Sequence, residues 1–318
     1  MMKSTVIFLV LLLLTSSLYS QQSGKYVLAI HGGAGYVNPD IPGTLVDAYQ
    51  ASLERALRIG EEILKQGGTS LNAVEAVVKF LEDDSLFNAG RGGVLTDAGT
   101  VELDAAIMDG NTLASGAVTG VTTVKNPVSL ARLVMEKTPH IFLSAAGAER
   151  FADSMKVERV PNDWFITPGR KLDYERRIAE KQGGGTVGAV ALDQYGNLAA
   201  ATSTGGMMMK MQGRIGDAPV IGAGTYAENQ TCAISCTGKG EKFIRHSVAA
   251  SIANLMKYAG LPLRQAAKKV LYEVLSEGDG GLVAVDRNGN YELLFSTPSM
   301  FRGVVTSDGI FETGIWKK

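Results

Sequence analysis

The sequence contains few residues of the kinds that build several common functional sites. Only 2 cysteines and 3 histidines occur among 318 residues, and 31 Lys and Arg residues face 32 Asp and Glu residues. There is no positive excess to bind the phosphates of a nucleic acid. Cys232 and Cys236 lie four apart in a strand-like stretch, which would separate them by roughly 13 Å, too far for a disulfide. Without further ligands nearby, two buried thiols are expected, and a zinc site is not supported.

The first twenty residues have the pattern of a secretory signal peptide. They combine Lys3, an apolar stretch from Val6 to Leu14 and an end of small residues. The apolar stretch is too short to cross a bilayer comfortably. We therefore expect cleavage near Ser20, a mature chain beginning at residue 21, and a periplasmic or secreted protein.

The rest of the chain has the hydrophobicity patterns of a single α+β domain. Apolar residues three and four apart predict consecutive helices over 44–68 and 69–84, and a further helix over 241–258. β-compatible runs with turn signals predict antiparallel strands over 99–124 and a hairpin over 186–206. Because strands come in hairpins and helices in consecutive pairs, antiparallel sheets layered between helices are expected.

The stretch QGGGTVGAVALD places three glycines directly before a threonine and a predicted strand. Gly183, Gly185 and Gly188 fit the G-x-G-x-x-G spacing of a dinucleotide site. Such a site follows a strand, opens a helix and has an acid about twenty residues on, whereas here the order of elements is reversed. No lysine stands directly before Thr186, so a phosphate-binding loop is also excluded.

A second chemistry fits this junction, with Thr186 acting as a nucleophile after the chain is cut in front of it. The new α-amino group would have a pKa near 7.7–8.0 and would serve as the base. The residues alone fit equally well a flexible linker that continues the polar segment 153–182, which is expected to be exposed, so both readings stay open. The three histidines, His31, His140 and His246, lack a convincing serine or cysteine partner and are expected to be structural or solvated.

Seven stretches, in order along the chain, resemble the plant-type L-asparaginase and isoaspartyl peptidase family of N-terminal nucleophile hydrolases. They are HGGAG (31–35), FNAGRG (87–92), ELDAAIMDG (102–110), GTVGAVALD (185–193), TSTGG (202–206), GRIGDAPVIGAGTYA (213–227) and TGKGEKFIR (237–245). The resemblance implies a four-layer αββα sandwich of two antiparallel sheets between helix layers. It also implies self-cleavage between Gly185 and Thr186 into an α chain, 21–185, and a β chain, 186–318, assembled as a dimer of αβ heterodimers.

The same resemblance implies catalytic roles for several residues. Thr186 would be the nucleophile, Thr204 would tune it by a hydrogen bond, and Thr237 with Gly238 would form the oxyanion hole. A hydroxyl and a backbone N–H are donors of the kind that stabilise a developing oxyanion, although TGKG by itself is more typical of a simple turn. Asn88 is an accessory candidate for maturation or the active site.

Arg214 and Asp217, with Gly238, would bind the substrate. Arginine suits a carboxylate and aspartate suits an ammonium group, so the pair would hold the amino-acid end of an asparagine-like molecule. Taken in isolation, the two residues would read as a surface salt bridge. The implied reaction is hydrolysis of β-aspartyl dipeptides and L-asparagine to L-aspartate through a covalent ester on Thr186. Glycosylasparaginase activity and a non-catalytic binding protein of the same fold are the alternatives.

The stretch LEDDSLFNAGR resembles the sodium-binding loop of the family. No cofactor is expected to be required, but a structural Na⁺ would be bound by backbone carbonyl oxygens of this loop. The residues that would supply them are Leu81, Glu82, Asp84, Phe87, Ala89 and Arg91.

Overall fold

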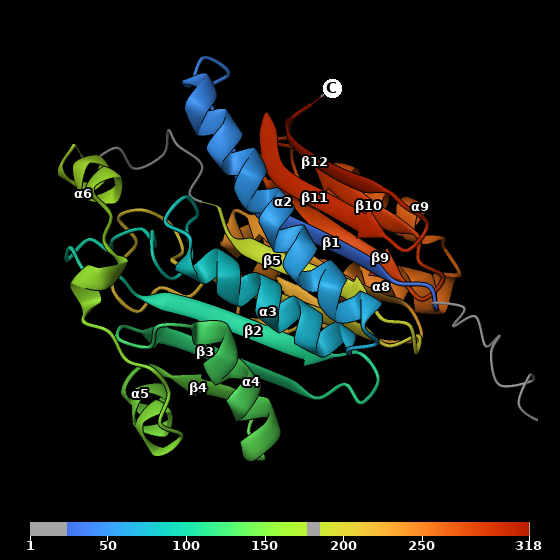
Figure 1. The fold of residues 1–318 in the computed structure, drawn as a ribbon, viewed down its shortest axis with the longest axis horizontal. Helices are drawn as coiled ribbons and strands as arrows, with labels where there is room; N and C mark the ends of the chain where they lie inside the picture. Colours follow the sequence, from blue (N-terminus) through green and yellow to red (C-terminus); the bar gives the residue numbers. More distant parts are fainter. Residues whose placement is uncertain (1–23, 177–184, 318) are drawn as a thin grey trace, which may run out of the picture.

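Two β-sheets form the centre of the protein (Figure 1). The computed structural model describes residues 24–176 and 185–317. The expected signal peptide and Gly183 lie outside the described residues. Among the residues that are described, no helix combines the length and apolar character needed to cross a membrane.

The larger sheet has eight strands in the order β12-β11-β1-β5-β6-β2-β3-β4. The predicted hairpin over 186–206 is present as the antiparallel pair β5–β6. The sheet is not fully antiparallel as expected, because the short strand β4 runs parallel to β3. A parallel pair needs a crossover connection, which helix α4 (Pro127–Lys137) provides. The strands are β1 (Val27–Gly35), β2 (Leu103–Asp109), β3 (Ser115–Val121), β4 (Phe142–Ser144), β5 (Val187–Leu192), β6 (Leu198–Thr204), β11 (Ser299–Thr306) and β12 (Phe311–Trp316).

The smaller sheet has four antiparallel strands in the order β10-β9-β8-β7. Its strands are β7 (Thr225–Ala227), β8 (Cys232–Gly238), β9 (Gly280–Asp286) and β10 (Tyr291–Phe295). Both cysteines lie on β8, where they are buried and free, so the prediction of two buried thiols is confirmed. Burial raises the pKa of both thiols.

The helices largely follow the predicted periodicity. The helix predicted over 69–84 begins behind Thr69, whose hydroxyl accepts a hydrogen bond from the amide of Asn72. The helix predicted over 241–258 is wrong as a single element, because Ser247 has a left-handed φ of 45° and divides it in two. The remaining helices are α2 (Gly43–Lys65), α3 (Ser70–Asp83), α5 (Ala145–Ser154), α6 (Pro168–Glu175), α7 (Gly240–Arg245), α8 (Val248–Ala259) and α9 (Leu263–Lys269), with a 3₁₀ helix, η1 (Asn162–Phe165), and a π turn, η2 (Val270–Val274).

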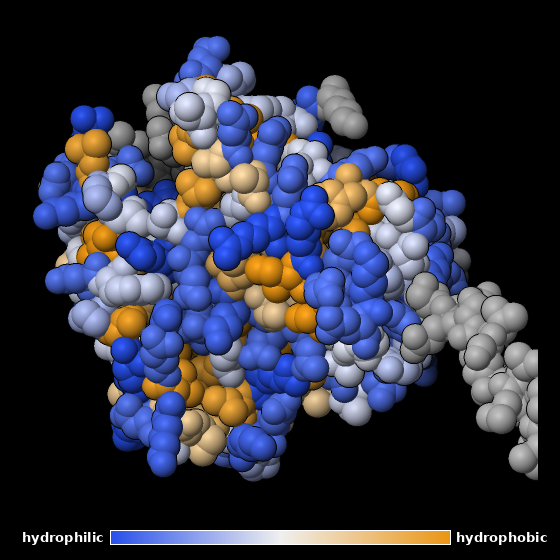
Figure 2. Space-filling model, in the orientation of Figure 1, coloured by the Kyte–Doolittle hydropathy of each residue, from blue (hydrophilic) through white to orange (hydrophobic). Residues whose placement is uncertain are grey.

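Three apolar clusters lie between the layers of the fold and hold them together. One joins α2–α5 to the larger sheet, a second lies between the two sheets, and a third joins the smaller sheet to α7–α9. Neighbouring residues of β1 divide between the first two clusters, since Leu28 faces the helices and Val27 faces the smaller sheet. The outward face over α2 and α3 is mostly hydrophilic, with apolar residues in small groups (Figure 2). The protein is therefore an α+β fold with two facing sheets.

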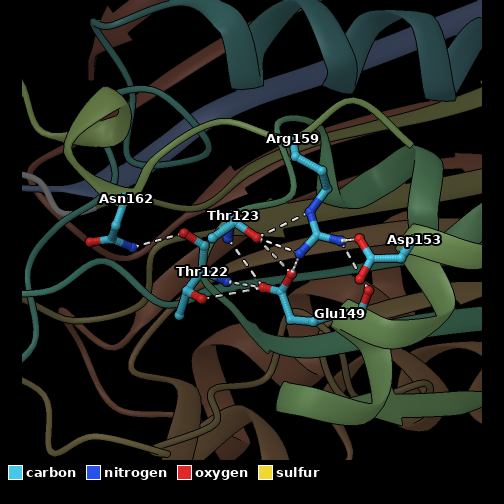
Figure 3. A network of polar contacts seen from close by, with 6 residues as sticks. All are labelled: Thr122, Thr123, Glu149, Asp153, Arg159 and Asn162. Carbon is cyan, nitrogen blue, oxygen red and sulfur yellow. Dashed lines mark hydrogen bonds and ion pairs between the residues drawn. The ribbon is translucent and has the colours of Figure 1, made fainter. Parts of the chain in front are cut away.

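A polar network attaches the segment after α5 to the larger sheet (Figure 3). The Glu149 carboxylate accepts hydrogen bonds from the amides of Thr122 (2.6 Å) and Thr123 (3.1 Å) and pairs with Arg159. Asn162 donates from Nδ2 to the carbonyl oxygen of Thr122 at 2.9 Å. The prediction of an exposed linker is thus wrong for 159–165, because its polar side chains pair with the protein and not only with water.

We expect Phe165→Ala to lower the free energy of unfolding by about 3–5 kcal/mol, as is typical for a deleted buried ring. The Phe165 side chain has no exposed surface and packs edge-on against Trp164, with ring centroids 5.4 Å apart. Urea unfolding would measure the change. Leu172→Ala in the same segment is the control, because its side chain is 43% exposed and should cost less than about 0.5 kcal/mol. Equal losses in both variants would contradict the packing of this segment.

Candidate active site

Thr186 and Thr204 meet where strands β5 and β6 lie side by side. Val187 pairs with Ser203 in the antiparallel register, which brings the residue before β5 opposite the last residue of β6. The two hydroxyl oxygens are 3.3 Å apart, and Thr204 Oγ1 also accepts a hydrogen bond from the amide of Gly206 at 2.9 Å. The hairpin therefore places a second, backbone-anchored hydroxyl beside that of Thr186.

Thr237 and Gly238 reach the same point from the end of β8. Thr237 Oγ1 accepts hydrogen bonds from the amides of Thr186 (3.3 Å) and Ala34 (3.1 Å). Gly238 has a φ of 155°, and a Cβ there would lie 2.2 Å from the carbonyl oxygen of Asp279. Only glycine fits this backbone without displacing it. The predicted oxyanion residues thus lie beside the predicted nucleophile.

His31 contacts Thr186, the predicted nucleophile, and its sequence context did not reveal this contact. Its Nδ1 is 2.8 Å from the carbonyl oxygen of Thr186, and its Nε2 is 2.8 Å from Ser235 Oγ. Burial lowers the pKa of His31 to about 3, so the ring is neutral at physiological pH. Because a carbonyl only accepts, Nδ1 carries the proton and Nε2 accepts from Ser235. The expectation of a structural histidine is correct, but the group that it supports is Thr186.

Arg214 and Asp217 lie near each other without pairing. Asp217 is 3% exposed, and its Oδ2 has no hydrogen-bond partner among the described residues. Burial raises the pKa of this carboxyl to about 7. Arg214 instead binds Glu241, with Nε and Nη2 each 2.9 Å from a carboxylate oxygen. A buried acceptor without a donor is costly, so Asp217 is suited to receive a donor from a ligand.

Most of these groups line one cleft with a volume of about 660 Å³, whereas Thr237 and His31 lie behind its lining. Its lining combines hydroxyls, a guanidinium, a carboxyl and backbone at glycines, as in sites for small polar ligands. The lining residues that the sequence predicted are Thr186, Thr204, Arg214, Asp217 and Gly238. Two neighbouring hydroxyl groups alone would not identify a reaction. Here they line the same cleft as the guanidinium of Arg214 and the carboxyl of Asp217.

Comparison with known proteins identifies the family. The family model described as asparaginase matches residues 24–315. The chain belongs to the asparaginase family. Among curated relatives, the isoaspartyl peptidase of Escherichia coli strain K12 is 46% identical over 315 residues, covering 93% of this chain and 97% of the relative. A probable isoaspartyl peptidase/L-asparaginase 2 of Arabidopsis thaliana is 42% identical over 326 residues, covering 92% of this chain and all of the relative.

In this member of the asparaginase family, Asn88 supports the turn after Thr204 without lining the cleft. Its Nδ2 donates to the carbonyl oxygen of Gly206 at 2.7 Å, and its Oδ1 accepts from the amide of Val94 at 2.8 Å. The carbonyl oxygen of Asn88 also accepts from the amide of Gly205 at 3.1 Å. Asn88 therefore positions the backbone that binds Thr204.

In the loop that carries Asn88, two glycines lie close to backbone carbonyl oxygens of the predicted sodium ligands. A Cβ at Gly90 would lie 2.3 Å from the carbonyl oxygen of Glu82, and one at Gly92 would lie 2.6 Å from that of Phe87. The Glu82 oxygen already accepts from the amide of Arg91 at 2.7 Å, but a carbonyl oxygen has a second lone pair. Gly90 and Gly92 therefore let the loop backbone fold close to the carbonyl oxygens of Glu82 and Phe87, two of the predicted sodium ligands.

Proposed function

We propose that this asparaginase-family protein is an amidohydrolase that cleaves itself before Thr186 and then hydrolyses β-aspartyl dipeptides and L-asparagine. The observation that carries the proposal is the single cleft that Thr186 and Thr204 share with Arg214 and Asp217. The names of the relatives, isoaspartyl peptidase and L-asparaginase, support the same reaction. Ammonia, or the amino group of a second residue, would leave from the side-chain carbonyl of the aspartyl half.

The maturation step would be an attack of Thr186 Oγ1 on the carbonyl carbon of Gly185. The C–N bond breaks, an ester forms, and the proton of the hydroxyl passes to the released amine; water then hydrolyses the ester. The resulting α chain, 21–185, and β chain, 186–318, would keep the four-layer αββα sandwich of N-terminal nucleophile hydrolases and would pair as a dimer of αβ heterodimers. Export by the signal peptide before residue 21 is part of the proposal.

In the mature enzyme, the α-amine of Thr186 would take the proton from its own hydroxyl. The oxygen then attacks the substrate amide, and the charge on the carbonyl oxygen is stabilised by the Thr237 hydroxyl and the Gly238 N–H. The leaving amine takes the proton, and water hydrolyses the aspartyl ester. His31, held neutral by burial, keeps the Thr186 carbonyl oriented and leaves the α-amine as the base.

No cofactor takes part in this proposed reaction. Na⁺ would bind to carbonyl oxygens of the loop before Gly92 and would supply fixed positive charge, not bond-breaking chemistry. Asn88 in that loop binds the carbonyl oxygen of Gly206 at 2.7 Å. The ion would therefore act on the backbone around Thr204.

A two-substrate assay on the cleaved protein tests the proposal. We expect aspartate release from β-aspartyl-leucine and from L-asparagine, and little from a glycan-bearing asparagine. Preference for the glycan substrate would instead assign a glycosylasparaginase. No release from a fully cleaved protein would favour the non-catalytic binding protein and would refute the proposed reaction.

The KM for L-asparagine is expected to rise about tenfold between pH 8 and pH 6. The pKa of Asp217 is raised to about 7 by burial, so the carboxyl is mostly neutral at pH 6 and mostly charged at pH 8. Only the charged form binds the substrate ammonium strongly. The charged fraction of the carboxyl falls about tenfold from one pH unit above the pKa to one unit below it. Asp217→Asn should raise KM and remove this pH dependence. A wild-type KM that is constant from pH 6 to pH 8 would contradict the role of Asp217.

A further inference from the structure

The cleft has a second wall, formed by segments that do not carry the residues for the aspartyl half of the substrate. Tyr36, directly after β1, and Pro298, between β10 and β11, both line it. The two segments are joined, because the hydroxyl of Ser299 donates to the carbonyl oxygen of Gly35 at 2.8 Å. Tyr36 is 51% exposed, so its ring is open to a ligand. This wall can therefore contact an apolar group of a substrate.

Most cationic side chains that line the cleft are already held by the protein. Glu241 pairs with Arg214 and Asp279 pairs with Lys239, with N–O distances of 2.9 and 3.0 Å. The second oxygen of Asp279, Oδ2, accepts a backbone amide at 2.9 Å, so both of its oxygens are occupied. Lys242 also lines the cleft, but it has no ion-pair partner among the residues that the structure describes.

Arg170 is the other cation of the lining, and it is fixed as well. Its Nε donates to the carbonyl oxygen of Gly92 at 2.8 Å, and its Nη1 is 4.0 Å from the carboxylate of Asp173. Within residues 24–176 and 185–317, Lys242 is therefore the lining cation whose charge remains available for an anionic group of a ligand.

Lys242 lies on the side of α7 that faces Asp279. Residues three apart on a helix share a side, and the amide of Lys242 donates to the carbonyl oxygen of Lys239 at 2.8 Å. Although burial opposes it, hydrogen bonds to Asp279 and the charges of Lys239 and Lys242 hold the pKa of that carboxyl below its usual value. A Cβ at Gly238 would lie 2.2 Å from the carbonyl oxygen of Asp279. The Lys242 ammonium thus belongs to the side of the oxyanion residue that Asp279 occupies.

An available ammonium group and an apolar wall match the chemistry of a leaving amino acid. A β-aspartyl dipeptide releases an amino acid, whose carboxylate and side chain lie beyond the scissile bond. L-asparagine releases only ammonia, which offers neither group. A hydrogen bond between two charged groups is stronger than one between neutral groups. These two features can therefore distinguish substrates that share the same aspartyl half.

We propose that Lys242 is a specificity-determining residue that binds the carboxylate of the leaving amino acid and favours β-aspartyl dipeptides with an apolar second residue over L-asparagine. This inference rests on the proposed function for the reaction. Tyr36 and Pro298 contact the apolar side chain of the leaving amino acid. Because Lys242 contacts only the leaving half, its removal weakens dipeptide hydrolysis and spares the hydrolysis of L-asparagine.

Lys242→Met is expected to lower kcat/KM for β-aspartyl-leucine about fivefold, as suits a charged contact at a half-buried lysine. The values for L-asparagine and for β-aspartyl-leucine amide, which lacks the carboxylate, should change by less than about twofold. Lys242→Arg keeps the charge and should retain at least about half of the wild-type kcat/KM. Lys268→Met is the matched control, since Lys268 is an exposed lysine of α9 outside the cleft lining.

The changes in protein and substrate form a cycle that isolates this one contact. Fully cleaved wild-type protein should prefer β-aspartyl-leucine to its amide about fivefold, and Lys242→Met should abolish that preference. An equal loss on all three substrates, or no loss on β-aspartyl-leucine, would overturn the role of Lys242 and leave the proposed function standing. Faster hydrolysis of L-asparagine than of β-aspartyl-leucine would also overturn it. If the wild-type protein hydrolyses none of the three, the proposed function fails and this inference fails with it.

Discussion

Thr186→Ala should remain a single full-length chain on a denaturing gel and should lose at least about 10⁴-fold of the hydrolytic activity, as is typical for a removed nucleophile. The wild-type protein should give two fragments. Alanine lacks the Oγ1 that lies 3.3 Å from Thr204 Oγ1, so neither the bond before residue 186 nor the substrate amide can be attacked. A time course by gel and an aspartate-release assay measure the two effects separately.

Thr186→Ser and Thr119→Ala complete this experiment. Serine retains a hydroxyl, so Thr186→Ser should still cleave, more slowly, and should keep measurable activity. Thr119 is a buried threonine of β3 outside the cleft lining, and its alanine variant should mature fully. An uncut wild-type chain with full activity would refute the proposed role of Thr186.

Local periodicity predicted the elements whose contacts are near in sequence. Helices α2 and α3 and the β5–β6 hairpin follow from apolar spacing and turn residues, because these signals act within a few positions. The division between α7 and α8 depends on the left-handed backbone of Ser247. Serine is not a residue type that indicates this conformation in a sequence. The parallel β3–β4 pair depends on how α4 crosses between them, which no local pattern specifies.

The residues of the candidate site and the Thr186–Thr204 contact were predicted from motifs, but the contacts of His31 and Glu241 were not. His31 contacts Thr186 and Ser235 across separations of 155 and 204 residues, so no spacing pattern relates them. Glu241 stands in the TGKGEKFIR motif, yet its link to Arg214 appears only when α7 is in place. The segment 159–165 was expected to be exposed because the region 153–182 is rich in charge, whereas Arg159 pairs with Glu149 and Asn162 binds the backbone of Thr122. Composition gives the number of charges and not their partners.

Gly33→Ala is expected to slow self-cleavage by at least about 100-fold, because misplacing a reacting group by about 1 Å has effects of this size. Gly33 has a φ of 118°, and a Cβ there would lie 2.3 Å from the Cα of Gly185. The new methyl group must therefore displace Gly185 and turn its carbonyl carbon, the proposed site of cleavage, away from Thr186 Oγ1. The strained φ adds a second cost that alanine cannot avoid. The uncut fraction over time, with thermal unfolding as a check on folding, measures the result.

Gly185→Ala separates the steric effect from the strained φ of Gly33. A Cβ at Gly185 would lie 2.2 Å from the Cα of Gly33, so it tests the same contact from the other side. Gly147→Ala in α5 is the control, since a Cβ there meets no atom within 4 Å, and it should cleave at the wild-type rate. Because the two glycine backbones touch, both Gly33→Ala and Gly185→Ala must impair the cut. Normal cleavage in either would show that this contact does not hold the bond for attack.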